Sequence, residues 1–303
     1  MSIEPISAYR RGRCIIVIFL FYSLTPLYCL PMPELPEVET TRQGISPHIK
    51  GRCVSKVILR HHQLRWPIDP QLPDYLARKK LLNVHRRGKY LLLEFFHGHL
   101  LIHLGMSGSL RIINPKTDEP QKHDHVDIIF SDNIGLRFHD PRRFGSILWT
   151  TENPSNHKLI CKLGPEPLLE DFTSEYLFKK SRKRKKDVKT FIMDSHIVVG
   201  VGNIYANESL FTSGIRPTKA AEKLSRKQCD QWVANIKVVL QRSITQGGTT
   251  LRDFVGGDGK PGYFAQQLNV YGRGGKPCVT CEHILKEIRQ AQRTTVYCTR
   301  CQK

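Results

Sequence analysis

Four of the nine cysteines have the spacing of a metal site. Cys278, Cys281, Cys298 and Cys301 form two C-x2-C pairs separated by sixteen residues. Each C-x2-C turn directs both sulfurs toward one tetrahedral ion, so the pattern predicts a single four-thiolate Zn2+ site. The zinc would be structural, because four protein thiolates leave no position for water. Two disulfides in a secreted protein are the alternative, which the other five cysteines and the basic composition disfavour.

A second group of chemically suggestive residues lies in "PMPELPEVETT", residues 31–41. Pro36 suits the first turn of a helix, and acidic residues such as Glu37 suit the positive end of the helix dipole. Met32 is followed directly by Pro33, and a Met before a small residue is often trimmed to expose a new N-terminus. The stretch therefore predicts a helix that opens a folded domain.

The chain is strongly basic. Lys and Arg number 47 against 27 Asp and Glu in 303 residues, which gives a formal net charge of +20. Such an excess indicates a polyanionic partner, most simply nucleic acid, although an acidic membrane surface is also compatible with it. The length is sufficient for two domains.

The first 32 residues differ in kind from the rest. A basic start is followed by an apolar run from Cys14 to about Leu20, as in a signal peptide or a short membrane anchor. Polar residues and Pro26 interrupt the run before it reaches the roughly 20 apolar residues of a spanning helix. A small-x-small cleavage pattern is missing as well. We expect residues 1–32 to be a leader outside the working protein.

Residues 52–150 contain short runs of branched and aromatic residues separated by turn formers, which is typical of a β-sandwich or barrel. The expected strands are "RCVSKVIL", "KYLLLEFF", "HLLIHLGM", "SLRII", "HVDIIFSD", "IGLRFHD" and "GSILWTT". After the linker "LGPEPLLEDF" the apolar period lengthens to that of helices. The expected helices are "TSEYLFKKS", "DVKTFIMDS", "NIYANESLFTSG" and "SRKQCDQWVANIKVVLQRSITQGG". The order predicts an α+β protein.

Three features of the second half could contact phosphates. Gly200 and Gly202 form a turn before Asn203, where backbone N–H groups at a helix N-terminus would suit a phosphate. The basic run from Lys179 to Lys189 is more simply a solvated face. Arg293 lies between the two cysteine pairs, within reach of a nucleic-acid backbone. Each feature alone is weak, but together with a zinc site they favour DNA.

From Met32 to Lys303 the chain resembles the bacterial bifunctional formamidopyrimidine-DNA glycosylases. The resemblance rests on "MPELPEVET", "HLGMSGSLR", "KHDHVD", "DPRRFG", "LGPEPL", "VVGVGNIYANESLF", "QGGTTLRDF", "DGKPGYFAQ", "VYGR" and the four-cysteine finger. It implies a β-sandwich domain at residues 33–163, a helical helix-two-turns-helix domain at 164–267 and a zinc finger at 268–303. DNA would lie in the cleft between the first two domains.

The resemblance also assigns catalytic residues. Pro33 would be the nucleophile through its secondary amine, which requires that Met32 be absent. Glu34 would be the general acid and base on the sugar, whereas Glu37 is explained almost as well by helix capping. Lys89 would hold the phosphate beside the lesion; without the resemblance it is an ordinary surface lysine. Lys260 would lie in a mobile loop over the flipped purine and assist catalysis on 8-oxoguanine.

A flipped base leaves a gap in the duplex, which the protein must fill. By resemblance Met106, Arg142 and Phe144 would enter the stack, with Arg142 pairing with the orphaned cytosine. Core packing is the ordinary explanation for Met106 and Phe144. The remaining expected DNA contacts are His123, in "KHDHVD", Asn203 and Arg293.

The expected function is base-excision repair of oxidised purines, chiefly 8-oxoguanine and formamidopyrimidines, by glycosylase and AP lyase action with β,δ-elimination. Its partner would be double-stranded DNA, not a membrane, and the protein would act as a monomer in the bacterial cytoplasm at the nucleoid. As written, however, the Pro33 nitrogen is an amide. A misplaced start codon is our preferred explanation, with proteolytic removal and a catalytically blocked damage-binding protein as alternatives. Within the enzyme class, an endonuclease VIII-like preference for oxidised pyrimidines is the runner-up.

Overall fold

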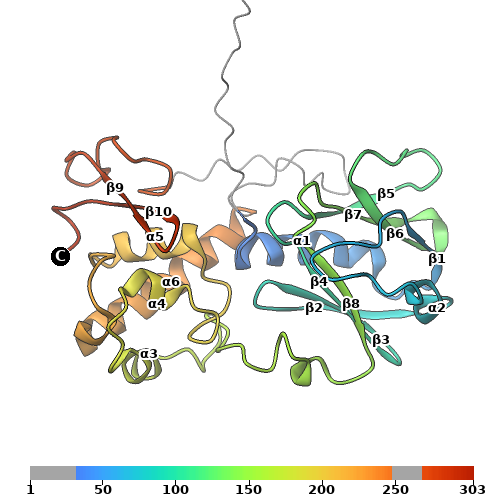
Figure 1. Cartoon of the computed structure of the whole chain (residues 1–303), viewed down its shortest axis with the longest axis horizontal. Helices are drawn as coiled ribbons and strands as arrows, with labels where there is room; N and C mark the ends of the chain where they lie inside the picture. Colours follow the sequence, from blue (N-terminus) through green and yellow to red (C-terminus); the bar gives the residue numbers. More distant parts are fainter. Residues whose placement is uncertain (1–31, 248–267) are drawn as a thin grey trace, which may run out of the picture.

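A computed structural model of the chain describes residues 32–247 and 268–303. Within these ranges the buried apolar side chains form three clusters. One cluster lies in the N-terminal half, one in the helical half and one around the C-terminal cysteines. Figure 1 shows the strands of the first half at one end of an elongated molecule and most of the helices at the other end. The expected α+β class is confirmed.

Two four-stranded antiparallel sheets form the N-terminal half of the described chain. The first sheet has the order β1-β6-β7-β5 and contains β1 (Val54–Leu59), β5 (Ser109–Ile113), β6 (Asp124–Phe130) and β7 (Gly135–His139). The second has the order β2-β3-β4-β8 and contains β2 (Leu81–Arg87), β3 (Tyr90–Phe95), β4 (Gly98–His103) and β8 (Ser146–Thr150). Both contribute alternate side chains to one core, as the period of two requires. The short helix α2 (Leu72–Leu76) packs beside β1.

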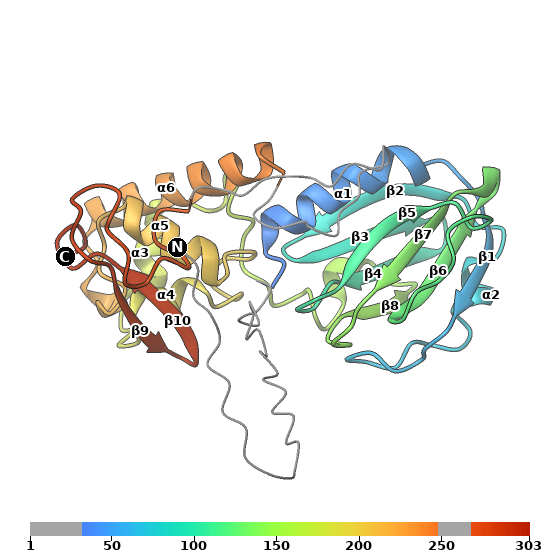
Figure 2. The same ribbon diagram turned by 90° about the horizontal axis from the view of Figure 1, so that it is seen from above.

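The helix α1 (Leu35–Ile49) joins the two halves. It begins with Pro36 in its first turn, and the Glu37 carboxylate accepts a hydrogen bond of 2.9 Å from the backbone N–H of Glu34. One face of α1 contacts β2, β3 and β5, and another contacts α6 (Arg226–Thr245). In Figure 2, α1 and α6 lie along the same edge of the molecule. Residues just before α1 are therefore held between the two halves.

The helical half contains α3 (Ser174–Ser181), α4 (Val188–Ile192), α5 (Asn203–Thr212) and α6. Hydroxyl or carboxylate side chains cap three of them: Thr173 on α3, Asp187 on α4 and Ser225 on α6. Trp232 of α6 is fully buried among the side chains of this half. Short 3-10 helices occur at Ser131–Asn133, Pro154–Asn156 and Ala221–Lys223.

The C-terminal segment forms an antiparallel hairpin of β9 (Lys286–Gln290) and β10 (Arg293–Tyr297), flanked by the two cysteine pairs. The hairpin contacts α5 through β10. No helix within residues 32–247 and 268–303 is both long and apolar enough to cross a membrane.

Candidate active site

The carboxyl group of Glu34 lies at the junction of the two halves. It is 2% exposed and accepts hydrogen bonds from three backbone N–H groups at the start of α5: Gly202 at 2.8 Å, Ile204 at 2.9 Å and Tyr205 at 3.4 Å. The partial positive charge of the helix N-terminus favours an acidic group there. Gly202 permits the approach, since a Cβ atom at this position would lie 2.3 Å from Cδ of Glu34.

This arrangement corrects one sequence-based expectation. The N–H groups of the "VGVGN" turn were expected to bind a phosphate, but those of Gly202, Ile204 and Tyr205 donate to Glu34 instead. Asn203 occupies the first position of α5 and its side chain is half-buried. A phosphate contact at this helix would therefore depend on the Asn203 side chain.

Burial perturbs the ionisation of Glu34 and its neighbour Lys89. Loss of hydration raises the pKa of Glu34 to about 7, although the positive charge of Lys89 acts in the opposite direction. Burial also lowers the pKa of Lys89, and the charge of Arg293 contributes to the same effect. Lys89 makes no ion pair or hydrogen bond with the described part of the chain. An external anion would therefore displace no described partner of this side chain.

The Glu37 side chain has a structural role at the start of α1. Besides capping α1, its carboxylate accepts a hydrogen bond of 2.7 Å from the Tyr205 hydroxyl. That hydroxyl also lies 2.6 Å from the Ser243 hydroxyl of α6. Glu37 therefore links α1 to α5 and α6, which favours the capping explanation over a proton relay.

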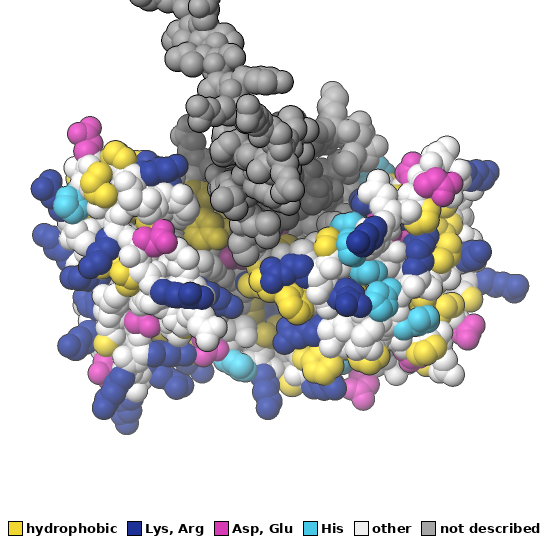
Figure 3. Space-filling view, turned by 45° about the horizontal axis from the view of Figure 1, so that its top comes forward, with side chains coloured by type: hydrophobic (Ala, Val, Ile, Leu, Met, Phe, Trp, Pro, Cys, Tyr) yellow, Lys and Arg dark blue, Asp and Glu magenta, His cyan; other side chains and the backbone are white. Residues whose placement is uncertain are grey.

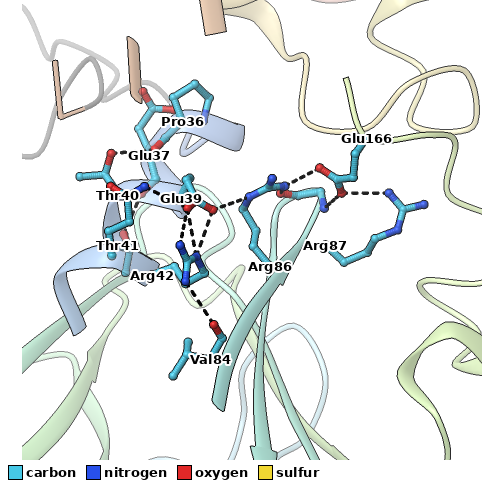
Figure 4. A network of polar contacts seen from close by, with 12 residues as sticks. Pro36, Glu37, Glu39, Thr40, Thr41, Arg42, Val84, Arg86, Arg87 and Glu166 are labelled. Carbon is cyan, nitrogen blue, oxygen red and sulfur yellow. Dashed lines mark hydrogen bonds and ion pairs between the residues drawn. The ribbon is translucent and has the colours of Figure 1, made fainter. Parts of the chain in front are cut away.

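A network of charged side chains fixes the turn that carries Lys89 (Figure 4). Arg86 donates to Glu39 of α1 at 2.9 Å and to Glu166 of the interdomain linker at 2.7 Å. Glu166 also accepts bonds from Arg87 at 2.9 Å and from the backbone N–H of Gly88 at 2.6 Å. The linker thus holds the residue immediately before Lys89.

Two turns of the β-sandwich carry Met106, Arg142 and Phe144. The Ser107 hydroxyl donates to Asp140 at 2.7 Å and accepts from the Arg142 backbone N–H at 3.2 Å, which ties the turns together. Their backbones are in close contact, since a Cβ atom on Gly105 would lie 2.4 Å from the carbonyl carbon of Phe144.

These side chains face solvent more than the core. Phe144 is 44% exposed and Met106 is half-buried, so core packing does not explain Phe144. The guanidinium carbon of Arg142 lies 5.2 Å from the centre of the Phe144 ring. A cleft of about 710 Å³ joins all three residues to Met32, the residue before Pro33. The structure therefore brings these turns close to the start of α1.

Histidines gather on the same side of the β-sandwich, where cyan side chains cluster in Figure 3. The His123 ring lies 6.2 Å from that of His125 and 6.1 Å from that of His139. The His123 backbone carbonyl accepts from Asp140, the residue that orders the Arg142 turn. His123 thus lies beside the turn that carries Arg142.

Sequence reasoning missed Lys189, which it grouped with a solvated basic run. Lys189 is 1% exposed, and its ammonium donates to the Thr294 carbonyl at 2.8 Å and the Thr295 hydroxyl at 2.7 Å. Burial lowers the pKa of Lys189 to about 8. Lys189 and the exposed Arg293 line one small pocket of about 260 Å³. The apolar neighbours of Lys189 in α4 were the available signal.

The four predicted zinc ligands come together. The Sγ atoms of Cys278, Cys281, Cys298 and Cys301 all lie within 4.8 Å of one another, and the cysteines form no disulfide. Four soft thiolates at this separation fit a tetrahedral zinc ion, which holds the two knuckles of the finger together. The structural zinc site is confirmed. Lys260 and residues 1–31 of the expected leader lie outside the described residues.

The fold and the site define a two-domain DNA-binding protein with a structural zinc finger. Three family models match in order: the formamidopyrimidine-DNA glycosylase N-terminal domain over residues 32–147, its H2TH domain over 163–255, and the zinc finger found in FPG and IleRS over 275–303. The chain belongs to the formamidopyrimidine-DNA glycosylase family.

Several known proteins are similar over nearly their whole length. The formamidopyrimidine-DNA glycosylase of Saccharophagus degradans is 65% identical over 273 residues, covering 90% of this chain and 100% of the relative. That of Teredinibacter turnerae is 63% identical over 272 residues, covering 89% and 100%. A solved structure of Lactococcus lactis Fpg (MutM) with DNA containing N7-benzyl-Fapy-dG has a TM-score of 0.82 and 32% identity, covering 89% of this chain and 100% of that one.

Proposed function

We propose that this protein is a base-excision repair enzyme that removes 8-oxoguanine and formamidopyrimidines from double-stranded DNA and then cleaves the abasic strand. The observation that carries the proposal is the buried carboxyl of Glu34, directly after Pro33 and beside Lys89. A carboxyl with a pKa of about 7 can both donate and accept a proton at neutral pH. Membership of the glycosylase family supports the substrate class.

In the proposed reaction the lone pair of the Pro33 nitrogen forms a bond to C1′ of the sugar, and the bond from C1′ to the base breaks. An α-amino group titrates near pH 8, well below a lysine, so a useful fraction is unprotonated. The Pro33 nitrogen then loses its proton, and the C1′–O4′ bond opens as a proton is delivered to O4′. The product of this ring opening is an iminium ion, which acidifies the C2′ protons. Their loss expels the 3′ phosphate by β-elimination, and δ-elimination then expels the 5′ phosphate. Glu34 would move the protons at the sugar.

Three side chains would hold the DNA backbone near this reaction. Lys89 would bind the phosphate beside the lesion, with Asn203 and Arg293 contacting phosphates from the helical half. The lack of an internal partner for Lys89 among the described residues supports its part. Burial lowers the pKa of Lys89 most, and the charge of Arg293 lowers it further, so a bound phosphate would favour the charged form of Lys89.

The turns of the β-sandwich would fill the gap left by the flipped base. Met106 and Phe144 would stack as apolar wedges, Arg142 would pair with the orphaned cytosine, and His123 would contact the backbone nearby. Exposure of Phe144 and the shared cleft with Met32 support this part of the proposal. Lys260 would act from the segment over the flipped purine. One cleft per chain makes a monomer sufficient.

The second candidate is a damage-binding protein without catalysis. It is favoured by one observation: in the full sequence the Pro33 nitrogen forms an amide with Met32 and has no lone pair available for attack. Such a protein would bind a lesion duplex and form no covalent intermediate.

The deciding experiment compares the full chain, a form starting at Met32 and a matched Met32 form with one alanine inserted before Pro33. The initiator Met32 is trimmed from both shorter forms, so that only the unmodified one has Pro33 at its N-terminus. Each is incubated with a duplex holding one 8-oxoguanine opposite cytosine, sodium borohydride is added, and the products are separated on a denaturing gel. We expect only the unmodified Met32 form to be trapped covalently and to cleave the strand. If no form is trapped while all bind the duplex, the damage-binding candidate replaces the enzyme.

A further inference from the structure

The helical half carries a second basic surface apart from the cleft. Its exposed cations are Lys180, Lys183, Arg184, Lys185, Lys223 and Lys227, which we call the α3–α4 face. None of the six forms an ion pair with a described carboxylate. In Figure 1, α3 lies at the lower edge of the helical half, whereas the start of α1 lies near the centre of the molecule. Figure 3 shows Lys and Arg side chains gathered at this lower edge.

The backbone of this face is fixed by long-range bonds. The segment after α3 and the segment before α6 lie side by side, because the N–H of Glu222 donates to the Arg184 carbonyl at 3.0 Å. The N–H of Ala221 likewise donates to the Lys186 carbonyl at 3.0 Å. The cations therefore project from an ordered scaffold, not from a free tail.

The aromatic ring of Phe178 lies beneath two of the arginines at this face. The guanidinium carbons of Arg182 and Arg226 lie 4.1 Å and 4.4 Å from the centre of the Phe178 ring. Arg182 also donates to the Leu224 carbonyl at 2.7 Å, and Arg226 pairs with Glu175. Cation–π contacts of this kind hold two like charges near each other at the base of the face.

We propose that the α3–α4 face binds the phosphate backbone of a second DNA duplex while the cleft holds the first. Several unpaired cations on a rigid surface suit a regularly spaced polyanion, which they bind with release of counterions and without reading sequence. Two separated DNA-binding surfaces let a protein pass directly from one duplex to another. The face would thus serve transfer between DNA segments during the search for damage.

The test measures dissociation of the full chain from a fluorescent lesion-free duplex as unlabelled duplex is added at rising concentration. Direct transfer makes the dissociation rate increase with competitor concentration, whereas simple release leaves it constant. We expect the increase in the wild type, and about a fivefold or greater loss of its slope in the variant Lys183→Glu/Arg184→Glu/Lys185→Glu.

The matched control is Lys56→Glu/Arg78→Glu/Lys80→Glu, which makes the same change in net charge at exposed positions of the β-sandwich half. It should keep the wild-type slope, and the corresponding glutamine variant at 183–185 should lose part of it. Equal slopes for the wild type and the glutamate variant, with zinc content and folding unchanged, would overturn the proposal, as would a wild-type rate independent of competitor. An acidic protein partner would then be the better explanation. Since the duplex has no lesion, the result does not depend on the excision chemistry.

Discussion

Burial of the Glu34 carboxyl makes the stability of this protein depend on pH. Its pKa is raised from 4.5 to about 7, so the folded state holds a proton that the unfolded state releases. The contribution of Glu34 to stability is therefore fully present below pH 4.5 and is lost as pH rises through 7. Between pH 5 and 8 this loss amounts to about 2 to 3 kcal/mol.

The substitution Glu34→Gln should remove this loss, because glutamine does not titrate. From pH 5 to pH 8 the unfolding free energy of the wild type should therefore fall by about 2 kcal/mol more than that of the variant. Urea denaturation at the two pH values measures it. Parallel pH profiles for both proteins would contradict the raised pKa.

The planar guanidinium of Arg142 gives another prediction at the scale of one residue. If Arg142 pairs with the orphaned cytosine, Arg142→Lys keeps the charge but loses the fixed pair of donors. The ratio of single-turnover excision rates opposite cytosine and opposite adenine should then fall by about tenfold. Arg143→Lys, in the same exposed turn, is the control and should leave the ratio unchanged. An unaltered ratio in the Arg142 variant would exclude Arg142 as the pairing residue.

At the scale of elements, Glu166 binds the linker between the two halves to the end of β2. Its side chain is 11% exposed and pairs with Arg86, which is 12% exposed. Glu166→Gln takes the shared carboxylate from Arg86 and from Arg87, which is 25% exposed, while Arg86 keeps its bond to Glu39. We expect a loss of about 2 to 3 kcal/mol in unfolding free energy.

The comparison for this prediction is Glu175→Gln, which breaks the exposed pair with Arg226 and should cost under about 1 kcal/mol. Chemical denaturation of both variants gives the two values. Equal losses would mean that the Glu166 network contributes no more than a surface ion pair.

Local patterns predicted most elements but not their long-range contacts. Seven of the strands were expected from runs of apolar residues, whereas β2 was missed because Leu81–Arg87 mixes its apolar side chains with His85 and two arginines. The bond from Gly202 to Glu34 spans 168 positions, which no local period can reveal. The same limit applies to Lys189. Its apolar neighbours in α4 hint at burial, but its partners Thr294 and Thr295 lie in a hairpin more than 100 positions away.

At the scale of the whole molecule, the zinc finger and the β-sandwich have separate apolar cores. Cys298→Ser should therefore abolish zinc binding and unfold the finger while the sandwich stays folded. Loss of β10 also removes the partners of Lys189 and displaces Arg293. We expect DNA affinity to fall about 100-fold or more, measured by fluorescence anisotropy alongside zinc content. Retained affinity in a zinc-free variant would show that the finger is dispensable for binding.

The position of Glu34 has a consequence for how such a protein can be divided. The carboxyl is carried by the chain just before α1, but the three N–H groups that hold it belong to α5. Neither half contains both the carboxyl and the N–H groups that bind it, so neither could be exchanged or inherited alone with this arrangement intact. A mixture of the separate halves would recover that group only by reassembling this junction.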